Sequence, residues 1–344
     1  MNRTITTQAL MLAGLIGAFL GATPAAAQSA GDFYKGRQIT FIVGGGVGGS
    51  YGLYARTIAP YLTKHIAGNP SVVVQHIEGG GGVPASNYVH NVAPKDGSYI
   101  GMTQMNAVMQ QVVRPAAIKY DSRTWHWIGN VSPMRSVVAV RKDSGVATME
   151  DAKKKEVVMG ATSKASEMYM TPALLNHYQG TKFKIVLGYP GMAQTMLAIE
   201  KGEVQGRAGS YVSLASSHAP WLKEGKLSLL AQMALTRDPA MKDVPLMQDF
   251  AKSDEERKVY FLNAAQTAFG RSIFVPGGVP ADRVAALRAG FQAAVKDAGF
   301  LADAERQKMP VEPMSGEELV AVARDLLDTP PAIVKAFQEA TAGK

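Results

Sequence analysis

Short runs of β-branched residues alternate with segments of helical periodicity from residue 39 onward, and this alternation leaves few folds open to the chain. It occurs in two blocks. Alternating strands and helices pack as layers, with helices covering a mostly parallel sheet. The sequence therefore predicts two α/β units, with strands at 39–43, 72–75, 99–102, 137–140, 157–160, 184–187, 204–208 and 227–232.

The two blocks are followed by segments of different character. A charged, proline-containing connection covers 236–258, a further strand is expected at 272–275, and three or four helices close the chain. The first of these helices opens at Pro280. We place the unit boundaries near residues 136 and 262.

The first 27 residues have the composition of a secretory signal peptide. Arg3 gives a positive start, 9–20 are apolar, and Ala25 to Ala27 form an A-x-A cleavage site. The apolar run is about a dozen residues, shorter than the ~20 that a membrane-spanning helix needs. We expect cleavage near Ala27 and export to the periplasm, with an uncleaved anchor as the alternative.

Composition excludes several kinds of site. The chain has no cysteine, which removes disulfides, thiolate catalysis and cysteine metal sites. Its 6 histidines show no metal-binding spacing, so we expect no metal and no cofactor. The net charge is +8, but the basic residues are scattered, and their one tight run, 153–155, lies beside acidic residues. We therefore expect no nucleic-acid partner and a preference for anionic ligands.

A glycine-rich loop, 44–52, separates the first predicted strand from the first predicted helix. Its six glycines leave backbone N–H groups open to close approach, and the following helix adds its positive dipole end. Together they favour an anion site that needs no cationic side chain. The alternative is a turn that is merely flexible.

Other motifs overlap the same loop. Gly44, Gly46 and Gly49 fit a dinucleotide fingerprint, which also requires an acid about 20 residues on. The first acid after the loop, Glu78, comes 34 positions after Gly44, which argues against a dinucleotide site. Ser50 fits the G-x-S-x-G nucleophile elbow, so an exported serine hydrolase is the alternative function. A hydrolase elbow normally follows several strands, whereas Ser50 follows the first.

A second loop, 188–192, lies between a predicted strand and helix of the second block and presents amides in the same way. With it, the chain resembles the extracytoplasmic solute-binding proteins of tripartite tricarboxylate transporters, the Bug receptors. The resemblance spans nearly the whole mature chain and depends on the order of several segments. They are the glycine loop leading into Ala55-Arg56, the glycines after Val74, Pro94 to Gly97, Tyr120-Asp121, Gly188 to Gly191 and Pro276 to Pro280.

The resemblance implies a periplasmic-binding-protein (Venus-flytrap) fold. Two α/β domains with mixed, mostly parallel sheets would enclose a ligand cleft, one formed by 33–136 and 262–344, the other by 137–261. It also implies a monomeric receptor, not an enzyme, that passes a small organic acid to the membrane subunits of such a transporter. Whether the receptor serves transport or signalling, and which acid it binds, stay open at this point.

Ligand contacts are expected from both loops, as the resemblance implies, and from strand ends, where α/β sheets bind ligands. Arg207 could hold a carboxylate with two hydrogen bonds or form a structural ion pair. The expected ligand-binding residues are Gly45, Gly46, Gly48, Gly49, Ser50, Tyr51, Thr103, Asn106, Ser163, Ser166, Tyr189, Pro190, Gly191, Met192 and Arg207.

The sequence departs from the family pattern in two places. Gly52 stands where relatives carry an Asp, and 76–81 read His-Ile-Glu-Gly-Gly-Gly where relatives carry Asn-x-Pro-Gly-Ala-Gly. Losing the Asp removes a helix cap, worth ~1 kcal/mol, or a ligand contact. The departures therefore bear on which ligand binds. Trp125 and Trp127 are expected in the core rather than stacked on a ligand.

Overall fold

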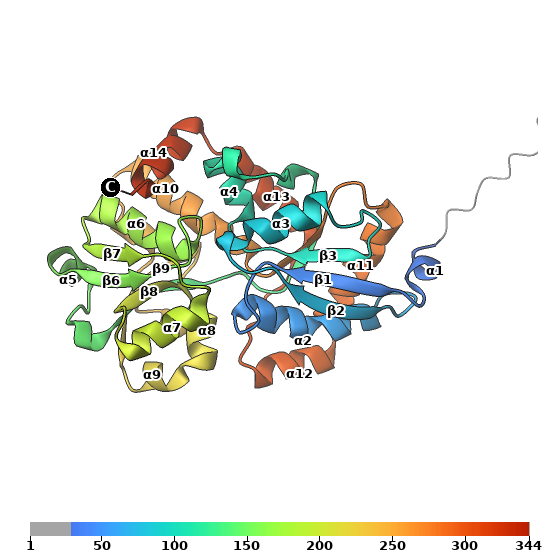
Figure 1. The fold of residues 1–344 in the computed structure, drawn as a ribbon, viewed down its shortest axis with the longest axis horizontal. Helices are drawn as coiled ribbons and strands as arrows, with labels where there is room; N and C mark the ends of the chain where they lie inside the picture. Colours follow the sequence, from blue (N-terminus) through green and yellow to red (C-terminus); the bar gives the residue numbers. More distant parts are fainter. Residues whose placement is uncertain (1–28, 344) are drawn as a thin grey trace, which may run out of the picture.

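The computed structural model describes residues 29–343, so the predicted signal peptide lies outside the described residues. Two sheets lie side by side, each covered by helices (Figure 1). One sheet has six strands in the order β11-β4-β10-β3-β1-β2, and the other has five in the order β7-β6-β8-β5-β9. The predicted two-unit α/β fold is confirmed.

The first lobe contains the six-stranded sheet and the helices that cover it. Its strands are β1 (Gln38–Val43), β2 (Ser71–His76), β3 (Tyr99–Met102), β4 (His126–Asn130), β10 (Ser272–Val275) and β11 (Met314–Ser315). Its helices are α1 (Ala30–Tyr34), α2 (Ser50–Lys64), α3 (Val83–Asn91), α4 (Ala107–Val113), α11 (Ala281–Ala294), α12 (Ala298–Arg306) and α13 (Gly316–Leu327).

The second lobe contains the five-stranded sheet. Its strands are β5 (Ser136–Arg141), β6 (Val157–Gly160), β7 (Phe183–Val186), β8 (Gly206–Ser210) and β9 (Leu227–Met233). The helices around it are α5 (Met149–Lys154), α6 (Glu167–Gln179), α7 (Met192–Lys201), α8 (Tyr211–Ser217), α9 (Ala219–Lys223), α10 (Asp254–Ala265) and α14 (Pro331–Thr341).

Both sheets are mixed, but parallel pairing is confined to part of each. β1 pairs in parallel with β2 and β3, and β6 pairs in parallel with β7 and β8. β10 and β5 run antiparallel to both of their neighbours. The reason is topological: these two strands arrive from the other lobe, so they begin at the edge where the parallel strands end. The sheets are therefore less parallel than the sequence predicts.

The two sheets share one strand order. β2-β1-β3-β10-β4 in the first lobe corresponds to β7-β6-β8-β5-β9 in the second. The loop after β6, 161–166, is thus the topological counterpart of the glycine loop. The loop at 188–192 follows β7 and corresponds to the loop after β2. This corrects the expectation that 188–192 repeats the arrangement of the glycine loop.

The tryptophans pack in the core, as predicted. Trp125 and Trp127 are 3% and 1% exposed, and Trp125 stacks on Phe274 with ring centroids 3.9 Å apart. The sequence pattern missed β4, which carries Trp127, and it missed α10, whose first turns fall in the charged connection. Periodicity is weak in both, since β4 is almost fully buried and α10 begins with three acidic residues.

The last helix joins the lobes. α14 lies against α6 and α10 of the second lobe as well as against α4 of the first (Figure 1). The domain ranges 33–136 with 262–344, and 137–261, stay a prediction, because a helix in the first range packs mainly on the second.

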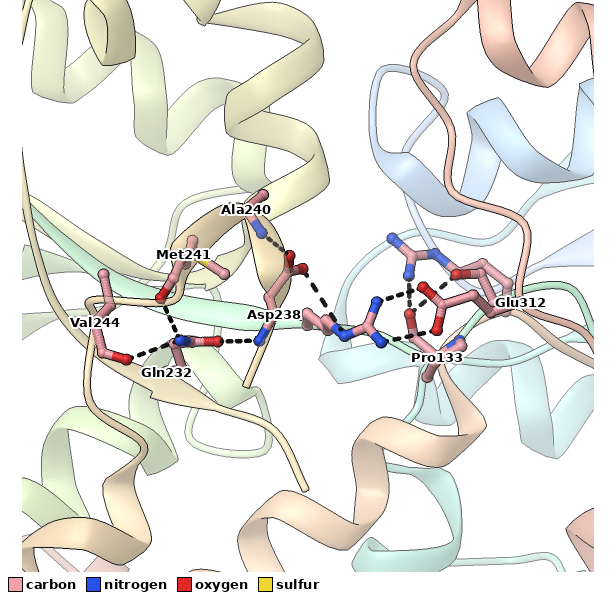
Figure 2. Close-up of polar contacts among 10 residues, drawn as sticks. Pro133, Gln232, Asp238, Ala240, Met241, Val244 and Glu312 are labelled. Carbon is pink, nitrogen blue, oxygen red and sulfur yellow. Dashed lines mark hydrogen bonds and ion pairs between the residues drawn. The ribbon is translucent and has the colours of Figure 1, made fainter. Parts of the chain in front are cut away.

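Ion pairs and hydrogen bonds hold the segment between β4 and β5, which crosses from one lobe to the other, against both lobes (Figure 2). Arg135, at the end of the crossing, donates from Nη1 and Nη2 to the two carboxylate oxygens of Glu312 at 2.6 and 2.7 Å. Its Nε lies 3.8 Å from Asp238, which follows β9. Arg271 donates to the Pro133 carbonyl at 2.7 Å. The crossing is thus held to segments of both lobes.

Candidate functional site

A cavity of about 220 Å³ lies between the lobes, where β1, β2, β3, β6 and β7 end. This is the edge at which open α/β sheets bind ligands. Its lining residues are Gly45, Gly46, Val47, Gly48, Gly49, Ser50, Tyr51, Glu78, Gly79, Gly81, Gln104, Thr162, Ser166, Glu167, Met168, Pro190, Gly191, Met192, Ala193 and Gln194.

Ten of the predicted ligand-binding residues line this cavity, and the structure brings both glycine-containing loops to it. They are Gly45, Gly46, Gly48, Gly49, Ser50, Tyr51, Ser166, Pro190, Gly191 and Met192. Their contact with a ligand stays a prediction. The other five, Thr103, Asn106, Ser163, Tyr189 and Arg207, lie outside the lining.

Three helices begin at the cavity without a side-chain cap. The N-cap residues of α2, α6 and α7 are Gly49, Ser166 and Gly191, and none of them accepts a hydrogen bond from its helix through a side chain. Elsewhere, α5, α10, α12 and α13 have side-chain caps, whereas α3, α4, α9, α11 and α14 begin without one. Uncapped N–H groups and positive helix ends therefore converge on the cavity, where an acceptor can satisfy them.

Asn106 and Thr103 make contacts within the protein instead. Asn106 Nδ2 donates to the Ala165 carbonyl at 2.6 Å, and Gln110 Nε2 donates to the same oxygen at 2.9 Å. These bonds join the first lobe to the loop after β6. Thr103 Oγ1 lies 2.5 Å from Ser86 Oγ beneath α3. Both residues follow β3, as predicted, but these side chains are hydrogen-bonded within the protein.

Ser163 and Tyr189 shape the cavity walls from behind. The Ser163 carbonyl accepts from Ser166 Oγ at 2.8 Å, which fixes the turn that starts α6. The Tyr189 ring is half-buried and packs in the hydrophobic cluster beneath α7. It lies near Gly160, where a β-carbon would come within 3.2 Å of it.

Arg207 is buried beside the cavity rather than in it. It is 2% exposed, and its Nε and Nη1 have no hydrogen-bond partner among the described residues. A β-carbon on Gly209 would meet both Arg207 Nη1, at 2.7 Å, and Met192 Cε, at 3.0 Å. Arg207 thus lies close behind Met192, a lining residue. Burial lowers the pKa of Arg207 to about 10, and nearby Glu167 opposes this.

A second buried guanidinium belongs to Arg271. This side chain is fully buried over the Tyr54 ring, and its Nε and Nη2 lack partners among the described residues. Its charge and that of Arg207 both act on Glu167. The protein therefore keeps two buried guanidinium groups near one buried carboxylate, and one positive charge is left without a matching negative one.

Glu167, the first residue of α6, is a lining residue that the sequence did not predict. Glu167 lines the cavity, is 7% exposed and accepts a hydrogen bond from Ser136 Oγ at 2.5 Å. Burial raises the pKa of Glu167, while Ser136, Arg207 and Arg271 act to lower it. An acid followed by the apolar run Met168 to Met170 was the available signal.

Glu78 and Gln104 were missed as well. Glu78 follows β2, and its carboxylate lies over Gly46, with Oε1 3.3 Å from the position of a β-carbon on that glycine. Gln104 follows β3, between Thr103 and the buried Met105. Gln104 lines the cavity, whereas Thr103 and Met105 do not. Which of these three side chains reaches the cavity depends on the tertiary packing at the end of β3.

The two departures from the family pattern, Gly52 and the segment 76–81, lie next to each other in the structure. A β-carbon on Gly52 would lie 2.9 Å from His76 Cε1 and 2.9 Å from Arg56 Nη1. His76 Nδ1 is hydrogen-bonded to the Gly45 carbonyl at 2.7 Å, and Arg56 Nη1 donates to the Val47 carbonyl at 2.8 Å. The His76 ring and the Arg56 guanidinium thus fill the space that an acid at position 52 would need.

The hydrolase alternative lacks a base at Ser50. Ser50 Oγ is buried, lines the cavity and has no hydrogen-bond partner among the described residues. The neighbouring His76 uses Nδ1 for the Gly45 carbonyl, and His218 lies 3.4 Å from Glu200.

Within residues 29–343, no group of His, Asp and Glu side chains is arranged to hold a metal ion. No helix in this range is long and apolar enough to cross a membrane.

Comparison with known proteins gives the family. Residues 54–338 match the model of the tripartite tricarboxylate transporter family receptor. A Cupriavidus necator protein, "UPF0065 protein in gbd 5'region", is 27% identical over 237 residues, 67% of this chain and 68% of that protein.

The fold is similar to the periplasmic binding protein BugD, with a TM-score of 0.70 and 20% identity over 90% of this chain and all of that one. It is also similar to R. palustris Rpa4515, solved with adipate, with a TM-score of 0.68 and 18% identity over 89% of this chain and 97% of that one. Because the family model covers nearly all of both lobes, the chain belongs to the receptors of tripartite tricarboxylate transporters.

Proposed function

We propose that this receptor captures a small organic acid in the cavity between its lobes and delivers it to the membrane subunits of a tripartite tricarboxylate-type transporter. The observation that carries the proposal is the convergence of three uncapped helix N-termini, those of α2, α6 and α7, on one cavity. The adipate bound to the similarly folded R. palustris protein supports a carboxylate as the ligand.

The electrostatics of the site favour one carboxylate. Each helix N-terminus carries roughly half a positive charge. Arg207 and Arg271 add two buried positive charges against the single buried Glu167, a difference of one. A ligand carboxylate would offset that difference and accept hydrogen bonds from the free amides, at a depth where water screens the attraction poorly.

Export is part of the proposal. Cleavage near Ala27 would release a mature periplasmic chain that begins at Gln28. The intact mass of the protein recovered from the periplasm tests this directly. A mass that still includes residues 1–27 would point to the uncleaved anchor instead.

A thermal-shift screen tests the binding function. The protein is unfolded and refolded to remove any co-purified ligand, and is then screened with mono-, di- and tricarboxylates. At 100 times its Kd, a ligand that binds only the folded state adds about 2.7 kcal/mol of stability, so the melting temperature should rise by several degrees. If no acid raises it, the proposal is wrong. Native mass spectrometry of the protein as purified would identify a retained ligand.

A variant separates this function from the hydrolase alternative. Ser50→Ala removes the only nucleophile that the G-x-S-x-G pattern offers. We expect no ester turnover in either protein and at most a severalfold change in acid affinity, since one neutral hydrogen bond is worth about 1 kcal/mol. Ester turnover that disappears in Ser50→Ala would favour the hydrolase.

A further inference from the structure

The charges that line the cavity are unusual for a site that binds acids. Among the described residues that line it, the charged side chains are Glu78 and Glu167, and no Lys or Arg is present in the lining. The two guanidinium groups that favour an anion, those of Arg207 and Arg271, lie behind the wall. A ligand in the cavity therefore meets free amides and hydroxyls together with two carboxylates.

Glu78 faces the ligand space from the rim. Its carboxylate lies over Gly46, and Oε1 and Oε2 are 3.3 and 3.6 Å from the position of a β-carbon on that glycine. Glu78 is exposed, and no hydrogen bond or ion pair from another described residue occupies its oxygens. It is free to accept a hydrogen bond from a bound ligand.

Glu167 supplies the second carboxylate, at the inner wall. One of its oxygens accepts from Ser136 Oγ, and the residue reaches the cavity at the start of α6. Glu78 belongs to the first lobe and Glu167 to the second, so a ligand held between the lobes meets an acid on each side.

Ser50 provides independent evidence that a polar ligand group enters here. Ser50 Oγ lines the cavity, its residue is 4% exposed, and it has no partner among the described residues. A buried hydroxyl is normally satisfied, so an unpaired one at a cavity wall indicates a ligand atom or an ordered water. Ser50 is also the first residue of α2, where the free amides favour a carboxylate.

The free amides and the Glu78 carboxylate favour different groups of a ligand. Because Glu78 lies over the glycine loop, an acid whose carboxylate binds at the α2 and α7 amides brings its other polar group near Glu78. A second carboxylate beside Glu78 would meet like charge, which is repulsive. An N–H donor there would form a charge-assisted hydrogen bond, which is among the stronger kinds.

We propose that this receptor selects an acid that carries an N–H donor, an ammonium or a primary amide, in place of a second carboxylate, and that Glu78 determines this selectivity. The inference rests on the proposed function, since it requires that one ligand carboxylate binds at the helix N-termini. It narrows the ligand from organic acids in general to amino acids and acid amides.

Calorimetric titration with matched probes tests the selectivity. Each set keeps one carboxylate and the chain length and changes only the far group: succinate, succinamate and β-alanine; glutarate, glutaramate and γ-aminobutyrate; adipate, adipamate and δ-aminovalerate. We expect the amide or amine of at least one set to bind about tenfold or more tightly than its dicarboxylate. A dicarboxylate that binds most tightly in every set that binds overturns the inference and leaves the proposed function intact.

Glu78→Gln assigns the effect to one residue. The variant should bind the dicarboxylate about tenfold more tightly and the amine about tenfold more weakly, while the amide changes little because the Gln oxygen still accepts. Glu156→Gln removes the same charge just before β6, at the sheet edge opposite the cavity, and should leave all affinities unchanged. Equal changes for all three probes in Glu78→Gln would show that Glu78 does not select. If no carboxylate binds either protein, the proposed function fails, and the inference fails with it.

Discussion

We propose that Gly45, Gly46, Gly48 and Gly49 provide access to the backbone rather than a backbone conformation that only glycine adopts. None of them has a positive φ, so an L-residue could adopt the same backbone at each position. What glycine provides here is an open path to the backbone N–H groups at the start of α2. A side chain at these positions should therefore alter binding more than folding.

Gly46→Asp tests this at the residue scale. The new carboxylate would lie beside Glu78, next to the amides proposed to hold the ligand carboxylate. We expect acid affinity to fall at least about a hundredfold, because like charge replaces an open anion site. Gly46→Asn adds nearly the same volume without the charge and should lose clearly less affinity. Equal losses in the two variants, measured by calorimetry, would mean that volume rather than charge matters.

Glu167 should make stability depend on pH. Burial raises the pKa of Glu167 above its usual value of 4.5. The contribution of a group with a raised pKa is fully present below the unfolded pKa and is lost as pH rises through the folded one. Wild-type protein should therefore lose stability, relative to Glu167→Gln, as pH rises from about 4 to about 7.

The measurement is the melting temperature of both proteins across this pH range without ligand. We expect the difference in favour of Glu167→Gln to grow by roughly 2 °C or more. Because the histidines are unchanged between the two proteins, their titration cancels in the difference. A difference that stays constant or shrinks would show that Arg207 and Arg271 hold Glu167 ionised.

At the scale of elements, the start of α4 in the first lobe is hydrogen-bonded to the loop after β6 in the second lobe. Asn106 and Gln110 both donate to the Ala165 carbonyl. Neither residue lines the cavity. They can therefore affect ligand affinity only through the equilibrium between open and closed lobes.

Removing both donors, in Asn106→Ala with Gln110→Ala, should weaken every ligand by the same factor, about five- to tenfold. The apparent affinity falls with the population of the closed form, whatever ligand is bound. Asn91→Ala removes a comparable amide that bonds to Lys119 within the first lobe, and should leave affinities unchanged. Ligand-dependent losses in the double variant would place Asn106 or Gln110 in contact with the ligand after all.

At the scale of the whole molecule, the two lobes are connected by crossing segments that contain Arg135 and Arg271. α14 also packs on both lobes (Figure 1). Hinge closure is the expected response of such an arrangement to a ligand that contacts both lobes. Small-angle scattering should show a smaller radius of gyration with a saturating acid than without one. The double variant without ligand should be at least as extended as the wild type. An unchanged radius on binding would indicate a cavity that is already closed.

Sequence and structure agree most where the signal is local. The predicted strands at 99–102, 157–160 and 272–275 match β3, β6 and β10 residue for residue, since each is a short apolar run between turn residues. β8 begins two residues later than predicted, and β4 and α10 were not predicted. Periodicity is weak in β4, which is almost fully buried, and in α10, which begins with three acidic residues.

The sequence by itself determined the two α/β units and the loop of free amides at the end of β1, because both follow from residue types that are close together in the chain. Only the tertiary structure decided which loops share a cavity, since Glu78, Glu167 and Gly191 are far apart in sequence. It also decided that Asn106 and Arg207 lie outside the lining, because the direction of a side chain at a strand end is set by its neighbours in the fold. We propose that the amides of the glycine loop hold a ligand carboxylate and that Glu78, brought near them by folding, selects among acids.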